Sequence, residues 1–364
     1  MVLYYNACVS SFNQGVIMAT KPNVKAEARL ESQLRAKSNA LKSTDKKYKI
    51  LQDELERANS ALHDALQVMA YKPTIYEMKP SPTAKNGQAT AFLLLSDVHC
   101  DELIPKHKVN GLNEHNPDIS KKRVATIFDR ALRFIRVDRQ ETNVDNLVVW
   151  LGGDFFTGEM HEASIAFAPI IATMFAQDMI ISGLTFLLQN ESNLKIHVVT
   201  SCGNHGRQYG SIKPVNQSSE QEHSLEWMMY HAIRAHFSKE KRITFQLDNS
   251  YHSYLKCYGK TIRFNHGHLG WRYNDGMGGV NGPLWKVISQ KWNHQVPAHL
   301  TICGHYHSLT FSALSRPYLV NGSTVGLSPY SLSFSTGAEP PAQAYFLVHS
   351  KYGIVGQRPL FAES

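Results

Sequence analysis

Apolar residues recur at alternating intervals of four and three positions in the first part of the chain. This period of 3.5 residues is typical of a coiled-coil seam. Only two polar residues, Lys37 and Thr44, break the seam, whose positions are Leu30, Leu34, Lys37, Leu41, Thr44, Tyr48, Leu51, Leu55, Ala58, Leu62, Ala65 and Met69. We therefore expect a helix over residues 23–70 that pairs, through residues 24–70, with the same helix of a second subunit. A single helix packed on its own domain is the alternative.

The segments on either side of this helix lack the pattern. Residues 1–22 are expected to form a disordered tail. Residues 71–90 contain several prolines and a glycine, which are typical of a linker. Residues 91–364 then form one large domain.

In this domain short apolar runs alternate with helical patterns. The runs predict strands at Ala91–Leu95, Asn146–Leu151, Lys195–Thr200, Thr261–Phe264, Leu300–Cys303, Tyr318–Asn321 and Ala344–His349. A helix capped by Ser120 is expected to bury Val124, Ile127, Phe128, Ala131, Leu132 and Ile135, and another is expected from about Glu220 to Phe237. Early alternation followed by denser strands predicts an α/β fold, a four-layer αββα sandwich of two mixed sheets flanked by helices.

Five of the predicted strands end in residues that bind metals or move protons. In chain order these residues are Asp97 and His99, then Asp154, then Asn204 and His205, then His266 and His268, and finally His305 and His307. Open α/β sheets bind ligands at the carboxyl ends of their strands, so these side chains are expected to converge. Residues i and i+2 of an extended strand point the same way, which favours one pocket for Asp97 with His99 and for His305 with His307.

The order of these motifs resembles the calcineurin-like metallophosphoesterases, whose pattern is DxH, GD, GNH, a later His before Gly, and GHxH. The resemblance spans Asp97 to His307 and implies that residues 91–364 are a metallophosphoesterase domain with two metals. It implies that Asp97, His99 and His307 hold the first metal, that Asn204, His266 and His305 hold the second, and that Asp154 bridges them. Two divalent transition metals are expected, with Mn favoured and Fe, Zn, Co or Ni as alternatives. The resemblance also assigns His205 to the leaving oxygen.

Two neighbourhoods differ from the family or add to it. The acidic residue that the family usually carries after GNH is replaced by Gly206 and Arg207, which removes an expected partner of His205 and places a guanidinium near the metals. His268 is expected to contact a ligand residue or the substrate, and His161 is expected at the surface. Trp271 and Tyr273, in a Gly-rich segment, are candidate stacking surfaces for a base. A plain turn with buried aromatic residues is the alternative.

Charge and cysteine content narrow the setting. The formal net charge of +8 is compatible with a polyanionic partner such as nucleic acid. The five cysteines include no CxxC pair, which favours reduced thiols in the cytoplasm. No signal peptide is evident, and no apolar stretch is expected to be long enough to span a membrane. The GNHGR variant also looks similar to phosphoesterases of bacteriophages and their hosts, in which case the cytoplasm would be that of the host.

The sequence therefore predicts a metal-dependent phosphoesterase that uses a two-metal-activated hydroxide. A phosphodiesterase or nuclease acting on DNA or nucleotides is favoured. The alternatives are a phosphomonoesterase for small molecules or phosphoproteins and, from another class, a non-catalytic nucleic-acid-binding or assembly protein.

Overall fold

The computed structural model describes most of the main domain and part of the N-terminal helix. The described residues are 75–78, 87–158, 164–208, 221–268, 284, 286–313, 317–334 and 339–363, with scattered positions between 29 and 50. Internal contacts divide the chain into two units, Met1–Lys72 and Pro73–Ser364. The described positions of the first unit are helical. The expected tail, and most of the expected coiled coil, lie outside the described residues.

The second unit is built on two six-stranded sheets. Sheet 1 has the order β12-β11-β2-β3-β4-β5, and sheet 2 has the order β1-β6-β7-β8-β10-β9. The strands of sheet 1 are β2 (Gln88–Leu95), β3 (Asn143–Leu151), β4 (Lys195–Thr200), β5 (Ile243–Gln246), β11 (Ala342–His349) and β12 (Gly353–Phe361). Those of sheet 2 are β1 (Tyr76–Met78), β6 (Ser253–Cys257), β7 (Lys260–Phe264), β8 (Leu300–Cys303), β9 (Thr310–Ser312) and β10 (Tyr318–Val320). Both sheets mix parallel and antiparallel pairs, as expected; β2 to β5 are parallel and β11 is antiparallel to β2.

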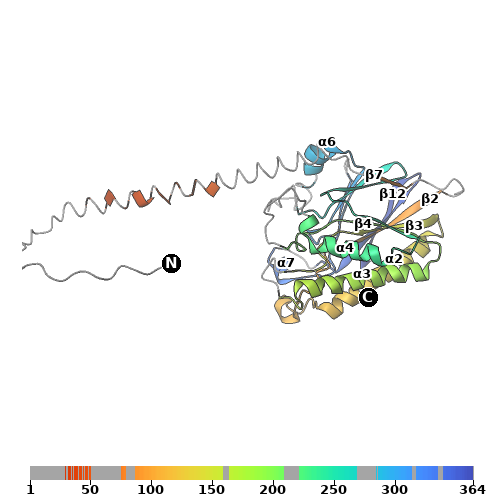
Figure 1. The fold of residues 1–364 in the computed structure, drawn as a ribbon, viewed down its shortest axis with the longest axis horizontal. Coiled ribbons are helices and arrows are strands. Elements are labelled where there is room, and N and C mark those ends of the chain that lie inside the picture. The colour runs from red at the N-terminus through yellow and green to blue at the C-terminus, as the bar shows by residue number, and fades with distance from the viewer. Residues whose placement is uncertain are drawn as a thin grey trace, which may run out of the picture. The chain divides into compact units, whose positions relative to one another are not determined.

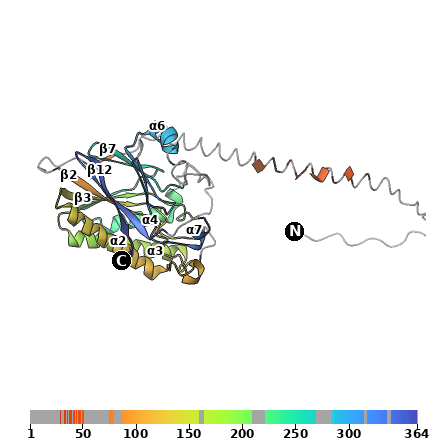
Figure 2. The same cartoon turned by 180° about the vertical axis from the view of Figure 1, so that it is seen from behind.

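Helices cover the outer faces of both sheets (Figures 1 and 2). The helices are α2 (Pro117–Asp138), α3 (Pro169–Asn190), α4 (Leu225–His236), α6 (Asn293–Gln295) and α7 (Pro329–Phe334), with 3-10 turns at Lys106–Val109 and Gln221–His223 and a π-helical turn at Ile288–Trp292. Helices α2, α3 and α4 share a core with sheet 1, while the segment around Ile288 and Trp292 packs on sheet 2. The predicted four-layer αββα sandwich is confirmed.

The alternation of side chains along each strand of sheet 1 feeds two separate cores. In β2, Ala91, Leu93 and Leu95 pack under the helices, whereas Phe92 and Leu94 pack between the sheets. Because successive residues of a strand point to opposite faces, a strand buried on both sides is a continuous apolar run. This explains why the apolar runs of the sequence predict β2, β3 and β4 as strands.

The start of α2 differs from the prediction. Its N-cap is Asn116, whose side chain accepts a hydrogen bond from Ile119 N at 3.0 Å, and Pro117 occupies the first turn. Ser120, the expected cap, is fully buried within the helix. The expectation for Ser120 was therefore wrong, because the Asn-Pro pair supplies a better cap and a preset first turn. The predicted buried stripe of this helix is confirmed.

The segment expected to be a linker, residues 71–90, contains regular structure. Tyr76–Met78 forms β1, which pairs in parallel with β6 at the edge of sheet 2. Gln88, near the end of that segment, already begins β2. Residues 76–78 and 88–90 thus belong to the sheets of the second unit.

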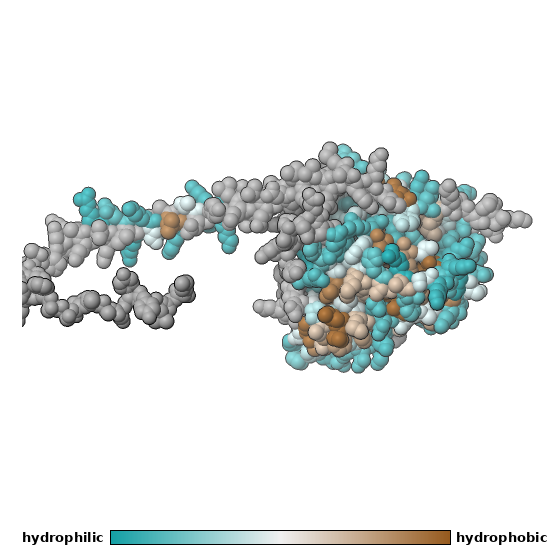
Figure 3. Space-filling view, viewed as in Figure 1, coloured by the Kyte–Doolittle hydropathy of each residue, from teal (hydrophilic) through white to brown (hydrophobic). Residues whose placement is uncertain are grey.

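Helix α3 corrects the expectation about apolar length. It has 22 residues and a window of mean hydropathy 1.6, which is long and apolar enough to cross a membrane by length and composition alone. Residues such as Ala176 and Leu184 are buried under sheet 1, so a core position accounts for much of this composition. Ile170, Ile171 and Met174 are exposed, and apolar atoms gather on this face of the domain (Figure 3).

Candidate metal centre

The polar residues that end the predicted strands meet at one edge of the sandwich. Loops that follow different strands are joined there by backbone hydrogen bonds. Asp97 N donates to Gly153 O at 2.9 Å, and Gly304 N donates to His266 O at 2.7 Å. The first bond joins the loops after β2 and β3 of sheet 1, and the second joins the loops after β7 and β8 of sheet 2. Between the sheets, His305 N, after β8, donates to Asp97 Oδ1, after β2, at 2.8 Å. Candidate ligands from both sheets therefore meet at one site.

Within this edge, three groups of side chains could each hold a metal ion. In each group the ligand atoms lie within 4.8 Å of one another. The groups are Asp97 with His99 and His307, His99 with Asp154 and His205, and Asp154 with His266 and His305. The first and third groups together contain six of the seven residues that the resemblance assigns to the metals. Asp154 belongs to two of the groups.

The backbone reaches this arrangement through left-handed residues. Asp97, His99, Asp154, His305 and His307 have φ values of 54°, 44°, 54°, 69° and 56°. Non-glycine residues seldom adopt this region, and such strain tends to gather at functional sites. The residues lie beyond the last residues of β2, β3 and β8, so the i and i+2 rule of extended strands is not what aligns them. That part of the sequence reasoning was wrong, although the side chains do converge.

Two of the motif glycines are required by close packing against the carboxylates. A Cβ on Gly203 would lie 2.0 Å from Asp154 Oδ1, and one on Gly304 would lie 2.4 Å from Asp97 Oδ2. Real Cβ atoms do not tolerate such contacts, so any side chain at either position would displace a carboxylate. The glycines of the GNH and GHxH motifs therefore set the position of the carboxylates as well as the turn.

The contact between His266 and Asp154 is a test of whether a cation fits. His266 Nδ1 lies 2.7 Å from the Gly152 carbonyl and must donate to it, so Nε2 of the neutral ring carries a lone pair. This Nε2 is 2.8 Å from Asp154 Oδ2, yet it makes no hydrogen bond of acceptable geometry. Burial by itself lowers the pKa of His266, but the Asp154 carboxylate outweighs it and raises that pKa to about 10. Two lone pairs at this distance require a positive charge, which either a proton or a metal ion supplies.

The remaining donors also fit a cation. His99 Nε2 and His307 Nε2 face each other at 3.2 Å, and His307 Nε2 is 3.4 Å from Asp97 Oδ1. Burial, with the neighbouring imidazoles, holds the pKa of His99 and of His305 well below the usual range, so these rings are neutral, as metal ligands must be. Asn204 is buried, and among the described residues its Oδ1 has no hydrogen-bond partner.

His205 lies beside the cluster and has a partner of its own. Its Nδ1 is 2.6 Å from the Thr157 carbonyl and donates to it, which leaves Nε2 as the acceptor, 4.0 Å from Asp154 Oδ2. Its ring meets His99 edge-on, with 4.7 Å between centroids. Gly206 and Arg207 stand where the family carries its acidic residue, and the Thr157 carbonyl is the partner of His205 instead. A backbone carbonyl orients the ring.

The other expected site residues are placed less closely. Arg207 continues the loop after His205 and is half-buried, with its backbone bridged to Ser224. His268 lies beside two candidate ligands, with ring centroids 5.3 Å from His266 and 6.2 Å from His305, and belongs to none of the three groups. His161, Trp271 and Tyr273 lie outside the described residues.

A buried carboxylate that the sequence reasoning missed ties two of the loops together. Glu226, in the first turn of α4, accepts hydrogen bonds from Phe155 N at 2.9 Å and from Gly203 N at 2.7 Å. These residues adjoin Asp154 and Asn204. Burial, and then the Asp154 carboxylate, raise the pKa of Glu226 to about 7. The sequence does hold a signal, because Glu226 lies on the buried stripe of α4 with Met229, Tyr230 and Ile233, where an acid is out of place.

A second missed group fixes the carboxylate of Asp97. Ser96 Oγ donates to Asp97 Oδ2 at 2.5 Å and accepts from Asn321 Nδ2 at 2.9 Å. Gln343 Oε1 in turn accepts from Asn321 Nδ2 at 2.7 Å and from Ser96 N at 2.9 Å. All four side chains are buried. The chain of bonds links β2, β10 and β11 beneath the first group of donors.

Beside this network, His115 supports the backbone of His99. His115 Nε2 donates to His99 O at 3.2 Å, and His115 Nδ1 accepts from Arg123 Nη1 at 3.1 Å. Arg123 is itself buried, forms an ion pair with Glu363, and donates to the carbonyls of Thr324 and Val325. Both bonds of His115 require the neutral ring.

Comparison with known proteins gives a likeness in fold only. No protein-family model and no curated protein matches the sequence. Among solved structures, a Streptococcus pneumoniae protein described as a predicted phosphoesterase has 12% identity and a TM-score of 0.33, with 75% of this chain and 90% of that one covered. Vacuolar protein sorting 29 of Cryptosporidium parvum has 12% identity and a TM-score of 0.31, with 75% and 98% covered. A dimetal phosphatase from Danio rerio has 12% identity and a TM-score of 0.33, with 75% and 99% covered.

The neutral state of His115 gives a prediction about acid stability. Burial, and then Arg123, lower the pKa of His115 to about 4, whereas the unfolded chain takes up this proton near pH 6.5. The neutral ring of His115 therefore contributes about 3 kcal/mol to the free energy of unfolding. This contribution is complete above pH 6.5 and is lost as the pH falls toward 4. His115→Gln retains one donor and one acceptor but does not titrate. Urea unfolding at several pH values should show a shallower loss of stability for His115→Gln over this range, and parallel curves for the two proteins would contradict the assignment.

Proposed function

We propose that the chain is a metal-dependent phosphoesterase of the calcineurin-like type. The observation that carries this proposal is the sharing of Asp154 by two groups of candidate ligands within 4.8 Å. A shared carboxylate fixes the spacing of two cations and offsets part of their repulsion. One of these groups contains His99 and the other contains His266 and His305, which the assignment below places on different metals.

The donor set supports one assignment of ligands. Asp97, His99 and His307 would hold the first metal, Asn204, His266 and His305 the second, and Asp154 both. Imidazole with carboxylate suits divalent transition metals, and we propose Mn, with Fe, Zn, Co or Ni as alternatives. When bound, such a pair supplies Lewis-acid polarisation of the phosphoryl oxygens and a water that ionises near neutral pH.

His205 is the proposed general acid. The carbonyl of Thr157 holds the proton on Nδ1, so Nε2 is the atom that can carry a further proton to the leaving oxygen. A positioned acid of this kind typically contributes about 10²- to 10⁴-fold to the rate.

For the substrate we propose a phosphodiester, either DNA or a nucleotide, cleaved in the cytoplasm. The surplus of positive charge favours a polyanion, and Arg207, two residues after His205, is the proposed contact for a phosphate oxygen. A phosphomonoesterase acting on small molecules or phosphoproteins is the second candidate, since the same ligand set serves both reactions.

We further propose that residues 24–70 join two subunits. Leu41 is a seam position and is 65% exposed in the single chain. A second copy of the same helix would cover this side chain and its neighbours along the seam.

Asp154→Ala should abolish hydrolysis of bis-p-nitrophenyl phosphate in the presence of Mn²⁺, because both metals lose their common ligand. The unaltered protein is expected to bind about two metal equivalents. Elemental analysis of Asp154→Ala should show fewer. Asp145→Ala, in the strand β3 that precedes Asp154, is the matched control and should retain both the activity and the metal. Near-normal activity in folded Asp154→Ala would falsify the assignment, and parallel assays with p-nitrophenyl phosphate, single-stranded DNA and duplex DNA would rank the substrate classes.

His205→Gln and Arg207→Ala should affect different constants. His205→Gln should lower kcat, most strongly for poor leaving groups, with little loss of metal, because a proton donor is missing in the transition state. Arg207→Ala should raise KM for phosphate-rich substrates with kcat nearly unchanged, as expected when ground-state binding is lost. Equal loss of metal in both variants would show that these residues support the structure instead.

Removal of residues 1–72 should convert an oligomer into a monomer that still hydrolyses a small phosphodiester. Light scattering at micromolar concentration measures the mass of both proteins. The full chain should scatter as a multiple of 41.0 kDa. A full-length protein at the monomer mass would rule out self-association through the helix. Loss of activity only on long DNA would add substrate engagement to the role of the helix.

A further inference from the structure

A second pocket opens at the end of the sandwich opposite the metal centre. Its volume is about 340 Å³. The lining residues are Tyr76, Glu77, Met78, Asn146, Lys195, Ile196, His197, Lys241, Arg242, Thr244 and Leu255. Lys195 begins β4 and Thr244 lies at the start of β5, whereas the metal centre follows the last residues of the parallel strands. The two sites therefore lie at opposite edges of sheet 1.

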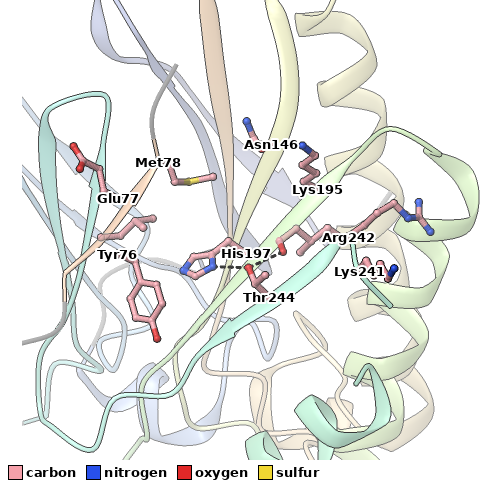
Figure 4. Close-up of a pocket in the computed structure, with 11 residues that line it drawn as sticks. Tyr76, Glu77, Met78, Asn146, Lys195, His197, Lys241, Arg242 and Thr244 are labelled. Carbon is pink, nitrogen blue, oxygen red and sulfur yellow. Dashed lines mark hydrogen bonds between the residues drawn. The ribbon is translucent and has the colours of Figure 1, made fainter. Parts of the chain in front are cut away.

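The pocket lies at the open end of the space between the two sheets. In β4, Ile196 and Val198 pack under the helices, so Lys195 and His197 point toward sheet 2, as Val199 does. From the other side, Met78 of β1 packs on the core between the sheets, which places Tyr76 on the same face. Side chains of the two sheets thus face each other across the pocket (Figure 4).

One wall of the pocket is aromatic and apolar. The ring of Tyr76, which is 40% exposed, lies 5.4 Å from the ring of buried His197, at an interplanar angle of 44°. His197 is held from below, since its Nδ1 is 2.8 Å from Thr244 Oγ1 and its Nε2 is 3.3 Å from Gln246 Oε1. Burial keeps the pKa of His197 below its usual range, so the ring is neutral. Met78 and Leu255 extend the apolar surface. A planar ring can stack on such a wall.

The opposite side carries positive charge (Figure 4). Lys195, Lys241 and Arg242 lie there, and Glu77 is the carboxylate among the lining residues. Arg242 is engaged, since its Nη2 contacts Glu240 at 2.8 Å and its Nη1 donates to Leu188 O. Lys195 and Lys241 are exposed and form no ion pair with any described residue. Two ammonium groups are therefore available to an anion.

We propose that this pocket binds a nucleotide, with the base against Tyr76 and the phosphate between Lys195 and Lys241. A stacked base and a phosphate use both walls at once. Inorganic phosphate would leave the aromatic wall unused, and a nucleoside would leave the lysines unused. The ligand is either a free nucleotide or one nucleotide of a strand. The proposal does not depend on hydrolysis at the metal centre.

Calorimetric titration of the metal-loaded full chain with adenosine monophosphate tests this site. We expect one binding event at the metals and one at the pocket. The double variant Lys195→Gln with Lys241→Gln, and separately Tyr76→Leu, should weaken the second event about tenfold while leaving hydrolysis of bis-p-nitrophenyl phosphate unchanged. Lys239→Gln lies in the loop before β5 but does not line the pocket, and it should bind as the unaltered protein does.

Titrations with other ligands separate the contribution of the base from that of the phosphate. Adenosine and inorganic phosphate should each bind the pocket more weakly than adenosine monophosphate. Competition by a short oligothymidylate would support a strand as the source, and its absence would support a free nucleotide. Unchanged titrations in both pocket variants would overturn the proposal, as would inorganic phosphate that binds as tightly as the nucleotide. Failure of the pocket with intact hydrolysis would leave the proposed phosphoesterase standing, and loss of hydrolysis alone would leave the pocket standing.

Discussion

The contact between Asp154 Oδ2 and His266 Nε2, at 2.8 Å, is the constraint on which the rest of the domain depends. It joins the end of a strand in sheet 1 to the end of a strand in sheet 2. Both atoms present lone pairs, so this contact is favourable only when a positive charge lies between them. A proton meets this need through the raised pKa of His266, and a metal ion meets it equally well.

The edge of the sandwich that holds the candidate metal centre contains strained backbone. Buried hydrogen bonds stabilise the loops that carry this strain. Five left-handed ligand residues each cost of the order of 1 to 3 kcal/mol. The compensation is visible in the carboxylate of Glu226, which accepts from the loops on either side of Asp154, and in the buried bonds of Ser96, Asn321 and Gln343. These groups touch no proposed ligand of the metals except through hydrogen bonds to backbone or to Asp97. They set the positions of the ligands before any metal is bound.

The sequence predicted those features that a short run of neighbouring residues determines, and missed those that depend on contacts between distant segments. β4 and β8 were predicted to the residue, because apolar runs bounded by polar ends are local patterns. Edge strands such as β1 and β9 have three residues each and carry too short a pattern. Glu226 was missed because its role depends on helix α4 meeting two distant loops. The candidate ligands could be proposed because five motifs repeat one local design, while the left-handed backbone that brings them together could not be read from residue types.

The parallel strands also explain why one domain can carry two separate sites. β4 begins at Lys195, which lines the second pocket, and ends at Thr200, just before the loop that holds Asn204 and His205. Between those ends its side chains are locked into the cores above and below sheet 1. A strand buried on both faces cannot slide by one residue without turning its apolar set the wrong way, so its two ends are held at a fixed separation. The proposed nucleotide pocket and the proposed metal centre therefore lie at opposite ends of one rigid strand.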